Sequence, residues 1–175
     1  MPNWVDNDIV ISTNNPLLID LLMQIKNSDD KRGFSDDDIS VFEVLNPIGE
    51  SDTEIAVEAW GCKWDIQHFS IMNASWKTTE EFLLNFQGQT PWSFPDNLLE
   101  HLQKTFTTDE FFVKVKCVWL EEGGEWGEWE NGGYVANGEL CKKDLTDETY
   151  AYNLLQEKFD IDTQWDWLRD EEDDE

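Results

Sequence analysis

The chain has 175 residues, of which 39 are Asp or Glu and 12 are Lys or Arg, so its formal net charge at pH 7 is −27. A surface this acidic repels nucleic acid and anionic membranes, which argues against direct binding to either and narrows the partners to basic proteins or cations. Disordered acidic chains contain few aromatic residues, yet this one holds 10 Trp, 10 Phe and 3 Tyr. The sequence therefore predicts a folded protein with an aromatic core and a carboxylate-rich exterior.

The first half of the chain contains one clear helical pattern and several short apolar segments. Residues 9–11 form an apolar run typical of a strand. In residues 16–27 apolar side chains recur at helical spacing, directly after an Asn that can cap a helix. Residues 41–45 and 63–72 are expected to be extended. Residues 54–60 fit a strand or a short helix, and the pattern does not decide between them.

The second half of the chain alternates more regularly. Residues 81–87 fit a strand better than a helical turn, because three apolar side chains fall on one face. Residues 95–105 form an amphipathic helix, and residues 111–118 alternate in the manner of a strand. Gly123 and Gly124 mark a hairpin turn, so residues 126–134 are the expected return strand.

This order of elements predicts an α+β fold, with an antiparallel sheet that carries its helices on one face. A ferredoxin-like split βαβ arrangement is the natural solution for a chain of this size, here with an extended hairpin and a C-terminal helix over residues 147–158. Residues 1–168 are expected to form a single domain with a C-terminal extension. Residues 169–175 are an acidic block that is expected to be disordered.

Three cysteines lie far apart, at Cys62, Cys117 and Cys141, and no CxxC pair is present. Their odd number and wide spacing favour buried free thiols over a disulfide framework or a zinc site. The start of the chain lacks the basic and apolar regions of a signal peptide. No apolar run approaches the ~20 residues that span a bilayer, so we expect a cytoplasmic protein with no membrane partner.

Four short motifs follow one another along the chain, at residues 1–4, 60–65 and 90–95 and in the glycine-containing hairpin after residue 120. Through these motifs the chain resembles, over about residues 1–136, the YubB ferredoxin-like family of phage and plasmid proteins. The resemblance implies a ferredoxin-like fold and an origin in mobile elements, but no established activity. Its acid-glycine hairpin spans residues 121–133. The other matching positions are Asn3, Trp4, Trp60, Gly61, Lys63, Trp64, Trp92 and Pro95.

No catalytic constellation stands out in the sequence. His68 and His101 are the only histidines, and neither belongs to an acid–His–nucleophile pattern. The acidic runs lack the alternating ligands and the glycine of a calcium loop. We therefore expect no enzyme activity, no metal and no cofactor. Trp60, Trp64 and Trp92 are expected to pack as a structural cluster rather than to line a pocket. The family resemblance makes the segments of Trp60 and Trp92 central, which implies that these two are buried.

The acidic hairpin and the acidic tail are the expected partner-binding regions. Some of their tryptophans should be exposed, and an exposed Trp amid carboxylates can anchor a protein partner. Simple packing of these rings is the alternative. The residues predicted to bind a partner are Glu121, Glu122, Glu125, Trp126, Glu128, Trp129 and Glu130 in the hairpin, and Trp165 and Trp167 in the tail.

Three functions are compatible with these features. The first is an acidic accessory protein of phage or plasmid type, which binds and inhibits a basic host protein that handles nucleic acid or serves in defence. Carboxylates four residues apart on a helix lie about 6 Å apart, similar to successive phosphates, so such a protein can mimic DNA. The second is a general protein-binding module that uses the Trp-rich hairpin. The third is an enzyme with a small-molecule site near Trp60, Trp64 and Trp92.

Overall fold

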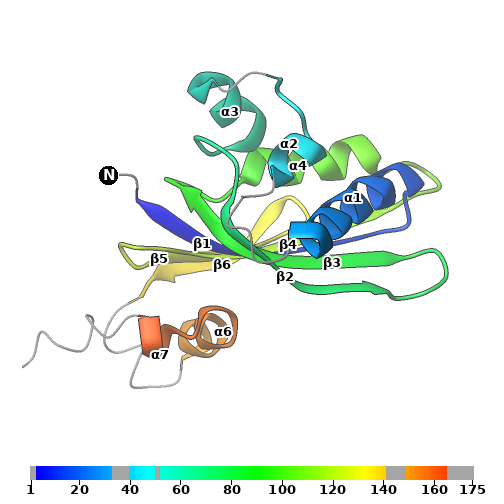
Figure 1. Cartoon of the computed structure of the whole chain (residues 1–175). Coiled ribbons are helices and arrows are strands. Elements are labelled where there is room, and N and C mark those ends of the chain that lie inside the picture. Colours follow the sequence, from blue (N-terminus) through cyan, green and yellow to red (C-terminus); the bar gives the residue numbers. More distant parts are fainter. Residues whose placement is uncertain (1–2, 33–39, 50–51, 141–148, 165–175) are drawn as a thin grey trace, which may run out of the picture.

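The computed structural model describes residues 3–32, 40–49, 52–140 and 149–164. These residues form one six-stranded sheet in the order β2-β3-β1-β4-β5-β6, with helices on both of its faces (Figure 1). Every neighbouring pair of strands is antiparallel. The strands are β1 (Trp4–Thr13), β2 (Gln67–Trp76), β3 (Phe82–Pro91), β4 (Val113–Glu121), β5 (Glu125–Glu130) and β6 (Gly133–Glu139).

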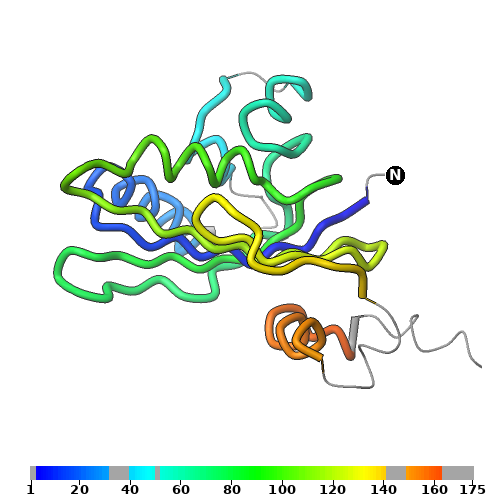
Figure 2. Tube along the Cα trace, turned by 180° about the vertical axis from the view of Figure 1, so that it is seen from behind, coloured from blue at the N-terminus to red at the C-terminus, as the bar shows by residue number. Residues whose placement is uncertain are grey.

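The helices divide between the two faces of the sheet (Figure 2). On one side lie α1 (Pro16–Arg32), α2 (Val41–Leu45), α3 (Thr53–Trp60) and α4 (Asp96–Phe106), and on the other lie α6 (Tyr150–Phe159) and α7 (Ile161–Gln164). The predicted α+β class with an antiparallel sheet is confirmed. The prediction that the helices share one face is wrong for the C-terminal helix. The acidic block of residues 169–175 lies outside the described residues.

Two segments that the sequence left open or misassigned are helices, and each has a capping carboxylate. The Asp65 side chain accepts hydrogen bonds from the backbone N–H groups of Phe42 and Glu43, so residues 41–45 form a helical turn instead of the expected extended piece. The segment at residues 54–60 is the helix α3, because Asp52 caps its first turn and Gly61, at φ 88°, ends it. The other predicted strands and helices are present with shifted ends, except that residues 126–134 are not one return strand: β5 ends at Glu130, and a turn at Asn131 and Gly132 leads into β6.

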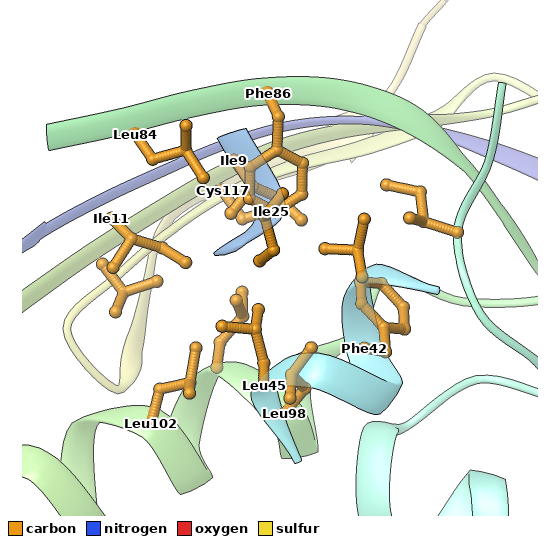
Figure 3. Packing of buried hydrophobic residues seen from close by; sticks show 14 of the residues in the cluster. Ile9, Ile11, Ile25, Phe42, Leu45, Leu84, Phe86, Leu98, Leu102 and Cys117 are labelled. Carbon is orange, nitrogen blue, oxygen red and sulfur yellow. The ribbon is translucent and has the colours of Figure 1, made fainter. Parts of the chain in front are cut away.

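The larger core lies between the sheet and the helices α1, α2 and α4 (Figure 3). It forms because alternate residues of β1, β3 and β4 point to this face. Each fully buried aliphatic or aromatic side chain contributes about 1.5–3 kcal/mol through removal from water. The labelled members of this core are Ile9, Ile11, Ile25, Phe42, Leu45, Leu84, Phe86, Leu98, Leu102 and Cys117.

A smaller core lies on the opposite face, where α6 packs against β4 and β5. Its buried members are Val118, Leu120, Trp126, Leu140, Ala151, Leu155, Phe159 and Ile161.

A polar contact continues this interface toward β1. Asp8 is 3 % exposed and accepts hydrogen bonds from the side-chain amides of Asn85 and Gln87, and the ammonium group of Lys158 lies 3.8 Å from it. The Gln87 amide also donates to the backbone carbonyl of Lys158. The C-terminal helix is therefore attached by apolar packing over β4 and β5 and by a buried carboxylate on β1.

Candidate protein-binding surface

A strained loop presents Trp92 to solvent directly after β3 ends. The residue adopts φ 74° and is 57 % exposed, although a left-handed conformation is uncommon for a non-glycine residue and costs about 1 kcal/mol or more. Its backbone N–H donates to the carbonyl of Asn3 at 2.8 Å. The hydroxyl of Thr90 donates to the carbonyl of Ser93, and the hydroxyl of Ser93 donates to the carbonyl of Gly61. These bonds fix the loop with the indole ring outward.

One side chain from the central Trp-rich motif contacts this ring, and an aromatic pair lies on the neighbouring segments, since Trp64 follows Lys63 and Trp4 pairs with Pro91 in the sheet. The ammonium group of Lys63 lies 3.6 Å from the centroid of the Trp92 ring, in a cation–π contact. Trp64 is 38 % exposed, and its ring meets that of Trp4 edge-on with centroids 6.1 Å apart. Gly61 at φ 88° turns the chain between Trp60, which is buried, and the pair of Lys63, which is half-buried, and Trp64, which is exposed.

Two carboxylates at the end of β4 border these aromatic rings. The side-chain amide of Asn3 donates to Glu121 at 2.6 Å, and the backbone N–H of Trp4 donates to Glu122 at 3.2 Å. Asn3 therefore connects Glu121 to the backbone of Trp92. We call this region the Trp92 surface, and it consists of Asn3, Trp4, Lys63, Trp64, Trp92, Glu121 and Glu122.

The burial predicted for Trp60 is confirmed, and that predicted for Trp92 is wrong. Trp60 is 4 % exposed, its ring meets Phe42 edge-on, and its indole N–H donates to the carbonyl of Asn46. The expected structural cluster of Trp60, Trp64 and Trp92 is therefore split between core and surface. Pro95 stands at the N-cap of α4, just beyond the Trp92 loop.

The prediction that tryptophans of the hairpin are exposed is wrong for both Trp126 and Trp129. Trp126 is 6 % exposed and Trp129 is 3 % exposed, because they point to opposite faces of β5 and each face is covered. Trp129 belongs to the larger core and Trp126 to the smaller core beneath α6. Neither ring can reach a partner unless the packing opens, so we no longer assign them to the binding surface.

The hairpin carboxylates have different environments. Glu128 is 4 % exposed, forms an ion pair with Lys116 at 2.5 Å and accepts a hydrogen bond from the hydroxyl of Tyr150 on α6. Burial by itself raises the pKa of Glu128, but these two partners lower it below its ordinary value. Glu128 is thus a structural bridge between the sheet and α6. Glu125 and Glu130 are exposed, and the predicted tail residues Trp165 and Trp167 lie outside the described residues.

A hollow of about 600 Å³ is lined in part by the Trp-rich motif, through Trp60, Lys63 and Trp64. It lies near the position of the small-molecule site that was one of the three functions compatible with the sequence. Its buried carboxylate, Asp65, is already engaged by the backbone N–H groups of Phe42, Glu43 and Ile66. Burial raises the pKa of Asp65 to about 6 in spite of these bonds. These bonds hold α2 in place. Because both oxygens of the Asp65 carboxylate accept them, neither oxygen is free to bind a substrate.

Two features of the Trp92 surface were not available to sequence reasoning. A positive φ at a tryptophan has no sequence signal, since Asn and Gly are the residues that usually indicate it. The placement of the half-buried Trp4 beside Trp64 and the bridging position of Asn3 depend on β1 lying between β3 and β4, which is a property of the sheet. Both residues were singled out only through the family resemblance.

The expected buried thiols are confirmed at Cys62 and Cys117, and burial raises the pKa of each. Cys141 lies outside the described residues. Within the described ranges, no group of three or more His, Cys, Asp or Glu side chains is placed to hold a metal ion. No helix in the described part of the chain has both the length and the apolar composition needed to cross a membrane. Comparisons of the chain with protein-family models, curated proteins and solved structures find no match.

Proposed function

We propose that the protein is an acidic binding protein that attaches to a basic protein partner through the Trp92 surface. The observation that carries the proposal is the exposure of Trp92 in a strained backbone conformation that several hydrogen bonds maintain. Strained, rigid positions concentrate at functional sites. An indole ring that is already fixed loses little conformational entropy when a partner covers it, and Trp is the residue most enriched among binding hot spots.

The net charge indicates the kind of partner. With a net charge of −27, the protein attracts basic surfaces and repels acidic ones at long range. Grooves that bind nucleic acid are strongly basic, because they neutralise phosphates with Lys and Arg. The proposed partner is therefore a nucleic-acid-handling or defence protein whose groove this protein occupies as a DNA mimic and inhibitor. It should bind neither nucleic acid nor membranes directly.

The order of the first four strands in the sheet supports a further part of this proposal, which concerns the family to which the fold belongs. Read from β4, the sheet runs β4-β1-β3-β2, with α1 following β1 and α4 following β3. This is the arrangement of a ferredoxin-like split βαβ unit, to which β5, β6 and α6 are additions. We propose a ferredoxin-like fold on this basis, and with it the YubB-like relationship and the role of a cytoplasmic accessory protein without enzyme activity or a cofactor.

A second candidate is a general protein-binding module whose charge only keeps it soluble. The observation in its favour is the composition of the Trp92 surface, which offers three aromatic rings and only two carboxylates. Salt separates the candidates, because an electrostatic competitor loses affinity steeply as salt rises and an aromatic anchor loses much less.

The test is affinity capture from a nuclease-treated bacterial lysate with the full chain, followed by measurement of the identified complex. Trp92→Ala should weaken binding by about tenfold or more, the effect of losing a hot-spot residue. The matched control is Met72→Ala, which removes another apolar side chain that is 54 % exposed, on β2, and it should bind like the parent protein. Added duplex DNA should displace the partner.

Three results would contradict the proposal. Equal binding by the parent protein and Trp92→Ala would exclude the Trp92 surface. Indifference of the complex to both salt and duplex DNA would exclude a competitor of nucleic acid and leave the general binding module. Tight binding of the protein itself to DNA in a gel-shift assay would also contradict the DNA mimic.

A further inference from the structure

A second aromatic hollow lies at the opposite end of the sheet from the Trp92 surface. It has a volume of about 470 Å³ and lies between the start of α1, the turn that joins β2 to β3, and the segment before β4. Trp92 follows the last residue of β3, whereas this hollow adjoins the last residue of β2 and the segment just after β1. We call it the Trp76 groove, and its lining residues are Asn14, Pro16, Ile19, Asp20, Trp76, Thr79, Glu80, Glu110 and Phe111.

The groove has an aromatic and aliphatic wall. Trp76 is 52 % exposed, and its ring is held edge-on against Phe82, with centroids 5.2 Å apart. Phe111 is half-buried and Ile19 is buried beside it. Because Phe82 itself belongs to the larger core, the indole ring of Trp76 is supported from behind and presents its remaining surface to the groove.

The charged side chains that line the groove are all carboxylates. Asp20, Glu80 and Glu110 come from three separate segments and are exposed. Within the described part of the chain, none of these three carboxylates forms a hydrogen bond or an ion pair, and no Lys, Arg or His is among the lining residues. Elsewhere, the carboxylates of Asp30 and Glu100 are paired with lysines. The Trp76 groove therefore combines an available aromatic ring with uncompensated negative charge.

We propose that the Trp76 groove binds an arginine side chain of the protein partner. A guanidinium group fits this environment because its plane stacks on an indole ring while its edge donates paired hydrogen bonds to carboxylates. A second copy of this chain is a poor occupant, since two bodies of net charge −27 repel each other. The inference rests on the proposed function only in taking the partner to be basic, and it places a second contact away from Trp92.

The test uses a short peptide, Gly-Arg-Gly-Arg-Gly, and the same peptide with citrulline in place of arginine. Citrulline keeps the size and planarity of the side chain but removes its charge. Titration into the ¹⁵N-labelled full chain should produce a saturable shift of the Trp76 indole resonance with the arginine peptide and a much smaller one with citrulline. The Trp76 signal is identified by its loss in Trp76→Leu, and the backbone amides of residues 79–80 and 110–111 should shift with it.

Two triple variants separate the groove from the overall charge. Asp20→Asn with Glu80→Gln and Glu110→Gln should weaken the arginine peptide by about tenfold, since charge-assisted hydrogen bonds are lost. The control variant removes the same amount of charge from exposed carboxylates elsewhere, through Glu54→Gln, Glu58→Gln and Glu139→Gln, and should retain most of the affinity.

Three outcomes would overturn the proposal: equal shifts with the citrulline peptide, equal weakening by the two triple variants, or shifts spread over the acidic surface without a maximum at Trp76. The citrulline comparison needs no variant, so it decides the matter even if a triple variant folds poorly. Trp92→Ala should leave this titration unchanged. Failure at the Trp76 groove and failure of the Trp92 surface are therefore distinguishable.

Discussion

The β4–β5 hairpin and the loop after β3 both contain tryptophans, but these tryptophans differ in exposure. Both place tryptophans next to turn residues, yet Trp126 and Trp129 of the hairpin are buried, whereas Trp92 of the loop is 57 % exposed. The hairpin is rich in Glu and looks like a surface, while the loop is rich in Pro, Ser and Thr and looks like a packed turn. The exposure of these tryptophans depends on which elements pack against each segment, and not on the amino-acid composition of the segment.

The physical cause of this difference is how many faces of each segment are covered by other parts of the fold. The strand β5 has the larger core on one face and α6 on the other, so both of its tryptophans are covered. The loop at Trp92 lies beyond the end of β3, where its strained backbone leaves the ring 57 % exposed to solvent. An acidic hairpin can thus be part of the core, provided that its inward carboxylate is paired, as Glu128 is.

The largest effect should come from the hairpin tryptophans. Trp126→Ala and Trp129→Ala should each lower the free energy of unfolding by about 3–5 kcal/mol, because each leaves a cavity in a packed core. Trp60→Ala should cost a similar amount. Urea unfolding of the purified variants measures this, with Val135→Ala on the exposed strand β6 as a control of small effect. A loss of less than about 1 kcal/mol for Trp126→Ala would mean that α6 does not cover β5.

The next effect concerns the carboxylate inside the hairpin. Lys116→Met should cost about 2–3 kcal/mol at pH 7, because it leaves Glu128 buried without its cation; the cost stays below that of a fully buried pair because Lys116 is 39 % exposed and solvent screens its charge. The pKa of Glu128 is lowered in the folded protein, so its contribution is full above the unfolded pKa and is lost as the pH falls through the folded value. The difference between parent and variant should therefore shrink below about pH 4.

The control for this experiment is Lys104→Met, which breaks the exposed pair with Glu100 and should change the free energy of unfolding by less than about 0.5 kcal/mol. A Lys116→Met variant that matches this control at pH 7 would show that the buried carboxylate needs no cation.

The stability of the folded protein should depend on pH with opposite sign at Asp65, in the segment beside the loop, and at Glu128, in the hairpin. Burial raises the pKa of Asp65 to about 6 in the folded protein, above the unfolded value of about 3.9. The folded state therefore binds the proton more tightly, and the parent protein loses stability as the pH rises from about 4 to about 6. Relative to the parent, Asp65→Asn should gain about 1–2 kcal/mol between pH 4 and pH 7, after allowance for solvent screening.

Urea unfolding of both proteins across this pH range measures the difference, which has the opposite sign to that expected for Glu128. A difference between parent and Asp65→Asn that stays constant from pH 4 to pH 7 would contradict the raised pKa.

The smallest effect on stability, and the largest on binding, is expected at Trp92. Trp92→Ala should change the free energy of unfolding by less than about 1 kcal/mol, because the ring is mostly exposed. Trp92→Gly should be more stable than Trp92→Ala by up to about 1 kcal/mol, since glycine adopts φ 74° without strain. Thermal and urea unfolding of the two variants give the comparison. A loss in Trp92→Ala as large as that in Trp129→Ala would place the ring in the core.

The amino-acid sequence by itself determined the elements whose signals are local. The leucine spacing of α1 and α4, the alternation of β4 and the glycine turn before β5 lie within short windows, and the structure has these elements where the pattern predicts them. The sequence also determined the acidic exterior, and the burial of Trp60, Cys62 and Cys117 agrees with what was expected of them. Apart from the burial of Trp60, which the family resemblance implied, these features depend on period and composition, which need no knowledge of distant neighbours.

Only the tertiary structure decided the features that depend on contacts between distant segments. The helix α2 forms where Asp65, more than 20 residues further along the chain, caps it. The position of α6 on the second face of the sheet, which period alone cannot assign, buries Trp126 and Glu128. The hydrogen bonds of Asn3 and Ser93 hold Trp92 in its left-handed conformation. In each case the deciding partner lies far away in sequence, and local propensity gave way to a specific contact that the fold supplies.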